Sequence, residues 1–257
     1  MSTPALELRD LRKRFGQTEI IRGASLVVNS QERVAMIGPN GAGKTTLFNL
    51  ISGRFPATSG DILLNGSSIR TLKPYEINRR GLSRSFQITN IFHRLSVFEN
   101  LRCAVLWSLG YRYSLWHRLA GLKDARDQAQ AVLEQIGLGA RGDTMAGLLP
   151  YAEQRALEIG VTVAGGASVI LLDEPTAGMS RSEADAAVAL IRKVTTGKTL
   201  VMVEHDMSVV FGLADKIAVV VYGEVIAYDS PEKVRANPAV QEAYLGTRAD
   251  ENEDAPA

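Results

Sequence analysis

The sequence predicts an α/β fold, in which short buried strands alternate with helices. Residues 169–172 and 199–203 are uninterrupted apolar runs, as expected of parallel strands that are covered on both faces. A third apolar run, 34–37, leads through a glycine-rich segment into a helical pattern at 46–51. Strand, loop and helix in this order are typical of a sheet core with mixed or parallel strands.

The remaining elements follow in chain order around this core. Residues 6–8 and 24–28 alternate like edge strands and residues 62–66 resemble a short hairpin, which together predict an antiparallel β subdomain. A further strand pair and two helices are expected near the C-terminus, with the strands at 217–221 and 225–226 and the helices at 182–194 and 207–213.

Between about residues 74 and 165 strand signals nearly vanish. Helical patterns such as 97–106 and 123–136 dominate there, so we expect a helical subdomain inserted into the α/β core. We expect a single domain over residues 1–247. The acidic, polar tail 248–257 is expected to be disordered.

Composition narrows the functional classes. The chain has 257 residues, 46% of them hydrophobic, which is ample for a packed core, and its 29 basic and 28 acidic residues give a net charge of +1. Nothing in that balance indicates nucleic acid as a partner. The single cysteine, Cys103, excludes an internal disulfide. We find no pattern of a secretory signal and no apolar run near the ~20 residues that cross a bilayer.

The most specific motif is a glycine-rich loop that matches the P-loop pattern G-x-x-x-x-G-K-[ST]. Its residues are Gly38, Pro39, Asn40, Gly41, Ala42, Gly43, Lys44 and Thr45, with Thr46 after them. The pattern stands between a predicted strand and a predicted helix, which disfavours an ordinary glycine-rich turn. The motif therefore predicts that the chain binds a nucleoside triphosphate with magnesium.

The chemistry of such a loop explains its residue types. Backbone N–H groups surround the phosphate oxygens, and glycine permits the close approach and the unusual backbone angles. The free N–H groups and dipole of the following helix add to the attraction. Lys44 is expected to reach the β- and γ-phosphates and the Thr45 hydroxyl to bind magnesium.

A second motif is an acidic pair at the end of an apolar strand, Asp173 and Glu174. Asp173 can hold magnesium through its water shell. Glu174 can polarise the attacking water, a general-base role worth roughly 10²–10⁴ in rate. The alternative is an acidic pair that only caps the strand before Pro175.

Two more polar residues are expected at strand ends. Gln87 follows residues 82–86, and His205 follows residues 201–204. A histidine at this edge can hydrogen-bond the γ-phosphate, and a glutamine can sense the phosphate and its magnesium. A lone glutamine or histidine is more often an ordinary polar residue, as we expect for His93 and His117 at the surface.

This ordered set of motifs resembles the nucleotide-binding domain of ATP-binding-cassette (ABC) transporters, a P-loop NTPase fold, over nearly the whole chain. The resemblance implies that Walker A is Gly38–Thr45, the Q-loop glutamine is Gln87, Walker B ends at Asp173 with Glu174, and the switch histidine is His205. It also implies that Phe15 stacks on adenine and that ATP binds between two cassettes.

The signature region departs from the family pattern. Where the family has L-S-G-G-Q, this chain has residues 149–153 with Pro150 in place of the serine and Ala152 in place of a glycine. Proline suits the first helical position, so we expect a helix to start there without the serine hydroxyl. The D-loop at 177–180 also differs. Because a homodimer would carry the defect twice, we expect a different partner cassette.

Within the cassettes, residues 81–88, 151–159 and 173–179 most resemble ATP-binding subunits of branched-chain amino acid importers. The resemblance implies two transmembrane permease subunits, a second ATPase, a periplasmic binding protein and a place on the cytoplasmic face of the inner membrane. The solute could be another amino acid, an amide or urea. A low-turnover regulatory cassette, the ATPase of another ABC transporter, a free ATPase and a P-loop kinase stay open.

A docking surface for the membrane subunit is a further expectation. Aromatic residues among arginines in 102–122, together with Arg84, Ile91 and Phe92, would form it. The aromatic residues are Trp107, Tyr111, Tyr113 and Trp116. The alternative is that this segment belongs to the core of the helical subdomain.

Overall fold

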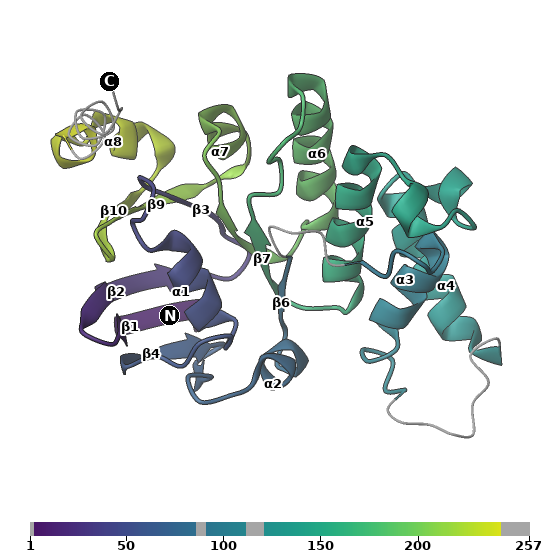
Figure 1. Cartoon of the computed structure of the whole chain (residues 1–257), viewed down its shortest axis with the longest axis horizontal. Helices are drawn as coiled ribbons and strands as arrows, with labels where there is room; N and C mark the ends of the chain where they lie inside the picture. Colours follow the sequence, from purple (N-terminus) through teal and green to yellow (C-terminus); the bar gives the residue numbers. More distant parts are fainter. Residues whose placement is uncertain (1–2, 86–90, 112–120, 243–257) are drawn as a thin grey trace. The chain divides into compact units, whose positions relative to one another are not determined.

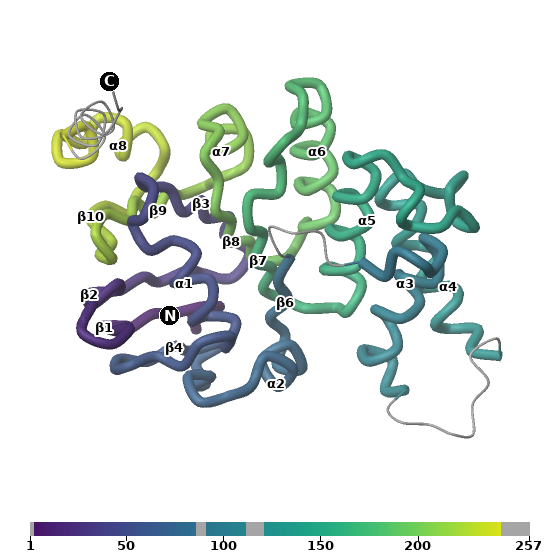
Figure 2. The backbone as a smooth tube through the Cα atoms, viewed as in Figure 1, coloured from purple at the N-terminus to yellow at the C-terminus, as the bar shows by residue number. Residues whose placement is uncertain are grey.

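The computed structural model describes residues 3–85, 91–111 and 121–242. The chain divides into two compact units, one of Met1–Arg80 with Thr199–Ala257 and one of Gly81–Lys198. Figures 1 and 2 trace both units, which are described separately below. The α/β class with antiparallel and parallel sheets is confirmed.

The first unit contains an antiparallel sheet with the strand order β2-β1-β4-β5. Figure 1 shows β1, β2 and β4 side by side at the N-terminal end of the chain. Their bounds are β1 Leu6–Phe15, β2 Thr18–Val28, β4 Ser59–Leu64 and β5 Ser67–Ser68. The first two strands are longer than predicted, because a bulge between Leu8 and Leu11 shifts the alternation of buried side chains.

The same unit contains a second sheet portion with the order β10-β9-β3-β8. Strand β3 lies between β8 and β9 and runs parallel to both, whereas β10 is antiparallel to β9. Every residue of β8 is buried, as its apolar run predicts. The bounds are β3 Arg33–Ile37, β8 Thr199–Val203, β9 Lys216–Val221 and β10 Glu224–Asp229.

Helices α1, α2, α7 and α8 lie in the described part of this unit. Helix α1 packs on β2, α7 packs on β3, and α8 packs on β9 and β10. They are α1 Lys44–Ile51, α2 Pro74–Arg79, α7 Met207–Leu213 and α8 Pro231–Ala236. The predicted helix at 207–213 is confirmed, and the Asp206 carboxylate caps it by accepting a hydrogen bond from the Ser208 N–H at 2.7 Å.

The second unit holds a parallel strand pair and a group of helices. Strands β6 Leu82–Arg84 and β7 Val169–Asp173 pair in parallel, with Arg84 opposite Leu171. Helices α3, α4 and α5 pack on one another, and α6 packs on α5 (Figure 1). Their bounds are α3 Val97–Val105, α4 Lys123–Gln135, α5 Tyr151–Ala164 and α6 Arg181–Val194. Two short 3₁₀ turns, Gly139–Arg141 and Ala146–Leu148, precede α5.

No helix in the described part of the chain is both long enough and apolar enough to cross a membrane.

Cys103 on α3 is half-buried, and burial raises the pKa of its thiol. The thiol therefore stays protonated at neutral pH.

Candidate functional site

The predicted P-loop follows β3 and its last two residues, Lys44 and Thr45, begin α1, so the structure confirms its strand, loop and helix setting. Gly38 and Gly43 have φ angles of 154° and 102°. A Cβ atom at Gly38 would lie 2.0 Å from the Val220 carbonyl oxygen, and one at Gly43 would lie 2.7 Å from the Ile21 Cδ1. Only glycine fits both positions, whereas a Cβ at Gly41 (φ 75°) would meet nothing within 4 Å.

The β9–β10 turn is hydrogen-bonded to the P-loop. The Gly223 N–H donates a hydrogen bond to the Ala42 carbonyl at 2.9 Å, and the Gly223 carbonyl accepts one from the Arg22 N–H at 3.0 Å. A Cβ at Gly223 would lie 2.0 Å from the Ile20 carbonyl oxygen. Backbone hydrogen bonds thus join the loop to the turn and the turn to β2.

Lys44 is the buried cation of the loop. Its Nζ donates to the carbonyl oxygens of Gly38 and Pro39 at 2.7 and 2.8 Å. The ammonium group is therefore held next to the loop backbone, within reach of an anion that the loop would bind. The two carbonyl acceptors fix the position of the Lys44 Nζ.

The rim of the loop is open, since Asn40, Gly41 and Thr45 are exposed and Thr46 is half-buried. Helix α1 begins after Gly43, which has no side chain that could accept from the first N–H groups. These N–H groups at the start of α1 are therefore placed to bind an anion. The residues present therefore fit a triphosphate, and the exposed Thr45 hydroxyl is a suitable ligand for a cation that accompanies it.

His205 lies at the same sheet edge as the loop. Met36 of β3 pairs with Val203 of β8, so the parallel strands lead at this edge to Gly38 and His205 respectively. His205 is exposed, and its N–H donates to the buried Glu204 carboxylate at 3.2 Å.

Phe15, the predicted adenine contact, ends β1 with 45% of its surface exposed. Its ring meets Phe55 edge to face at 5.5 Å, and Lys13 Nζ lies 4.7 Å from the ring centre. The exposed ring is therefore fixed in place and open to a stacking partner.

In the second unit Asp173 ends β7 and is paired with Arg84. The Arg84 Nη2 lies 2.8 Å from the Asp173 Oδ2, with the two side chains 5% and 3% exposed. Arg84 is therefore not part of the predicted docking surface. It lies on the same face of β6 as the buried Leu82, because side chains two residues apart in a strand share a face.

Glu174 follows directly and has a left-handed φ of 47°. The Arg155 Nη2 donates to its carbonyl oxygen at 2.6 Å, and the Ala177 N–H donates to the same oxygen at 3.2 Å. Arg155 is only 2% exposed. Its Nη1 also lies 2.7 Å from the Glu158 Oε2.

The signature-like segment leads into α5. The helix starts at Tyr151, one residue later than predicted, and Pro150 takes the capping position with ψ 154°. The Pro150 carbonyl still accepts from the Gln154 N–H at 3.0 Å, but its side chain offers no acceptor. The Tyr151 hydroxyl donates to the Ala177 carbonyl at 2.9 Å, which links α5 to the predicted D-loop.

The other residues predicted for the docking surface differ in their exposure. Phe92 is 63% exposed, as expected, but Ile91 is buried. Trp107 is half-buried, and the half-buried Tyr111 donates from its hydroxyl to the Asp124 carboxylate at 2.8 Å. Gln87, Tyr113, Trp116 and the tail 248–257 lie outside the described residues.

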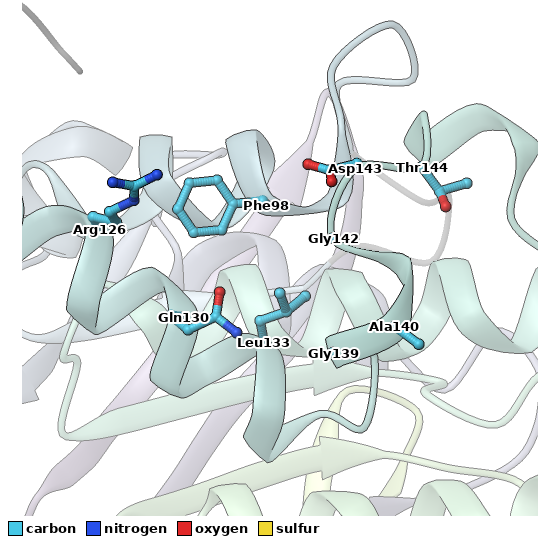
Figure 3. A pocket seen from close by; sticks show the side chains of 9 residues that line it. All are labelled: Phe98, Arg126, Gln130, Leu133, Gly139, Ala140, Gly142, Asp143 and Thr144. Atoms are coloured by element: carbon cyan, nitrogen blue, oxygen red, sulfur yellow. The ribbon is translucent and has the colours of Figure 1, made fainter.

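A separate hollow of about 470 Å³ lies among α3, α4 and the segment 139–144 (Figure 3). Arg126 and Gln130 of α4, Phe98 of α3 and Asp143 line it. No residue predicted to bind nucleotide is among its lining, so it is not the candidate site.

The sequence placed Arg84 on a docking surface and assigned no contact to Arg155 or Tyr151. Two signals in the sequence bear on these contacts. Arg84 is two residues from Leu82 on β6, and Tyr151 is four residues from Arg155 on α5, so each pair shares a face of its element. Neither reveals which carbonyl or carboxylate the side chain meets, since that depends on the tertiary packing.

Comparison with known proteins gives the family. The sequence profile described as ABC transporter matches residues 21–177, and that described as branched-chain amino acid ATP-binding cassette transporter matches residues 224–250. The high-affinity branched-chain amino acid transport ATP-binding protein BraF of Pseudomonas aeruginosa is 38% identical, over 96% of this chain and 99% of its own. The corresponding protein LivG of Escherichia coli K12 is 37% identical with the same coverage.

Solved structures agree with the fold. A nucleotide-free ATP-binding cassette superposes with a TM-score of 0.81 at 26% identity, over 94% of this chain and 98% of its own. The ADP conformation of MJ1267, a cassette of an ABC transporter, gives the same score at 28% identity, over 95% and 99% of the two chains. The resemblance seen in the motifs is confirmed, including that to the branched-chain amino acid group, and the chain belongs to the ATP-binding cassettes of the ABC transporter family.

Proposed function

We propose that this chain is the ATP-hydrolysing subunit of an ABC importer that takes up branched-chain amino acids, or related amino acids, amides or urea. The observation that carries the proposal is the P-loop cradle with the buried Lys44 at its base. The names and near-complete coverage of BraF and LivG support the solute class.

The proposed ligands are ATP and Mg²⁺. Gly38–Thr46 holds the phosphates, Phe15 stacks on adenine, and Thr45, Gln87 and Asp173 serve the cation, which when bound neutralises charge on the phosphates. Lys44 stabilises the charge that develops on the γ-phosphate. Glu174 orients the attacking water and His205 donates to the γ-phosphate, so both act where the terminal bond breaks.

The proposed partners are two permease subunits, a second ATPase and, indirectly, a periplasmic binding protein. An exposed apolar strip formed by Phe92, Leu95, Met145 and Leu148 is a suitable surface for a permease helix. The Ala146 N–H donates to the Leu95 carbonyl at 2.9 Å, and Ser96 bridges to Met145, so two separate segments present this strip together. Such docking places the chain on the cytoplasmic face of the inner membrane.

We favour a heterodimer because Pro150 provides no hydroxyl for a phosphate in an opposing cassette. The same feature supports a second candidate, a low-turnover cassette paired with a more active ATPase. The loss of one hydrogen bond to a charged group would weaken phosphate binding by roughly 1.5–3 kcal/mol. Turnover of the chain in a complex whose second ATPase is inactivated separates the two candidates.

The test of the main proposal is Glu174→Gln. We expect this variant to bind ATP but to retain it unhydrolysed, because the amide cannot take the proton from water. Glu224→Gln, at an exposed glutamate of β10, is the matched control and should turn over normally. Normal turnover in Glu174→Gln would remove Glu174 from the proposed role, and absence of ATP binding to the wild type would remove the proposed function.

A further inference from the structure

Helix α5 holds the loop that follows β7 through two side chains one helical turn apart. Tyr151 and Arg155 are separated by four residues and therefore share a face of the helix. The Arg155 Nη2 donates to the Glu174 carbonyl at 2.6 Å, and the Tyr151 hydroxyl donates to the Ala177 carbonyl at 2.9 Å. Two carbonyls of one short loop are thus bound by the same helix.

The Glu174 backbone requires such support. A glutamate with a φ of 47° is in a left-handed conformation that residues other than glycine, asparagine and aspartate rarely adopt. Conformations of this kind persist only where surrounding contacts fix them. The carbonyl of Glu174 receives hydrogen bonds from both Arg155 and the Ala177 N–H, and these contacts set the direction in which its side chain leaves the strand end.

Arg155 is itself immobilised. Its guanidinium is buried and its second terminal nitrogen, Nη1, lies 2.7 Å from the Glu158 Oε2 on the next turn of α5. The Glu158 side chain is 4% exposed, and the Glu158 carbonyl accepts from the Thr162 hydroxyl at 2.8 Å. The buried charge is therefore balanced, and Nη2 is directed at the Glu174 carbonyl by a rigid pair.

The far end of the loop is fixed as well. Gly178 has a φ of 75°, and a Cβ there would lie 3.7 Å from the Tyr151 ring, so the chain passes near the ring. Two residues on, the Ser180 N–H and hydroxyl donate to the Glu183 carboxylate at 2.8 and 2.6 Å at the start of α6. Tyr151 thus acts on a loop whose two ends are already anchored.

We propose that Tyr151 and Arg155 are positioning residues that set the orientation of Glu174, an inference that rests on the proposed role of Glu174 in hydrolysis. Tyr151 is the first residue of α5 and lies within the signature-like segment 149–153. Any displacement of that segment is therefore transmitted to the loop that carries Glu174. The Tyr151 hydroxyl links the two, and the family's glycine pattern has no group that could do the same.

The deciding experiment is Tyr151→Phe in the assembled transporter, because this change removes one hydroxyl and keeps the ring. We expect kcat for ATP to fall roughly ten-fold, as for a displaced catalytic group, with KM, ATP affinity and melting temperature unchanged. Tyr75→Phe, at an exposed tyrosine of α2, is the matched control and should leave kcat unchanged. Arg155→Lys, which keeps the charge beside Glu158, should lower kcat further.

A background of Glu174→Asp, which keeps a carboxylate but moves it, shows whether Tyr151 acts through Glu174. We expect Tyr151→Phe to have much less than its ten-fold effect on the single-turnover hydrolysis that remains there, because the carboxylate it positions is already displaced. A ten-fold loss that persists in this background, or an unchanged kcat in Tyr151→Phe alone, overturns the positioning role. Lack of hydrolysis by the wild type and the Tyr75→Phe control instead overturns the proposed function itself.

Discussion

At the scale of single residues, Lys44 illustrates how the loop prepares for an anion. Its ammonium group is held by two loop carbonyls, at Gly38 and Pro39, so little side-chain entropy remains to be lost when a phosphate binds. Hydrogen bonds that involve a charged group are worth about 1.5–3 kcal/mol.

Lys44→Ala should therefore lower ATP affinity roughly 10- to 100-fold in calorimetric titration, with the protein still folded by circular dichroism. Lys233→Ala, at an exposed lysine of α8, is the control and should bind ATP normally. Equal affinity of Lys44→Ala and the wild type would place the phosphates elsewhere.

The pair of Arg84 and Asp173 is a second residue-scale feature with a measurable consequence. Because both side chains are buried, removing the cation leaves an uncompensated carboxylate. Arg84→Met should lower the free energy of unfolding by about 3–5 kcal/mol in urea denaturation. Lys233→Met breaks the exposed pair with Asp229 and should cost no more than about 1 kcal/mol. A loss of the same small size in both variants would contradict the buried-pair account.

At the scale of elements, the β9–β10 turn is expected to determine the shape of the P-loop. Gly223→Ala should destabilise the protein and weaken ATP binding, because its Cβ would meet the Ile20 carbonyl at 2.0 Å beside the hydrogen bond to Ala42. Gly197→Ala is a matched control with a similar positive φ of 74° but nothing within 4 Å of its Cβ. Both effects can be read from thermal melts and ATP titrations. An equal loss of ATP affinity in the two variants would mean that strain, and not the turn's contact, is responsible.

Glu32, in the loop before β3, is bonded to β9 and β10 and predicts a pH dependence. Burial opposes its charge, but hydrogen bonds from Lys216, the Asn29 N–H and the Tyr228 hydroxyl outweigh burial and hold the pKa of its carboxyl below its ordinary value of 4.5. A carboxyl with a lowered pKa in the folded state stabilises the fold fully above that ordinary value. The stabilisation is lost as pH falls through the lowered pKa.

Glu32→Gln should therefore reduce stability at neutral pH and show a shallower loss below pH 4.5 than the wild type. Urea midpoints measured across that acid range test this expectation. Parallel pH profiles for the two proteins would mean that Glu32 does not contribute.

The same scale shows what sequence can and cannot predict. Apolar runs located β3, β7, β8 and β9 because these strands are buried on both faces, and the P-loop pattern located the turn into α1. The lengths of β1 and β2 were underestimated because the bulge near Leu8 breaks the alternation. The partners of Arg84, Tyr151 and Arg155 depend on packing between elements distant in sequence, which periodicity does not encode.

At the scale of the whole molecule, function depends on chains that this one must contact. Phe92→Asp should release the chain from its permease subunits in size-exclusion chromatography, because a charge would replace a 63% exposed aromatic side chain in the apolar strip. ATP binding by the isolated chain should persist. Phe211→Asp, at a 45% exposed phenylalanine of α7, is the control and should leave the complex intact. Survival of the complex in Phe92→Asp would remove the strip from the interface.

The central claim is that ATP hydrolysis by this chain powers transport. The most direct measurement is ATP turnover together with uptake of labelled leucine in vesicles that contain the assembled transporter and its binding protein. We predict that turnover is stimulated in the complex over the isolated chain and that Glu174→Gln abolishes both turnover and uptake. Undiminished leucine uptake with Glu174→Gln, or turnover that yields a phosphorylated small molecule, would contradict the account.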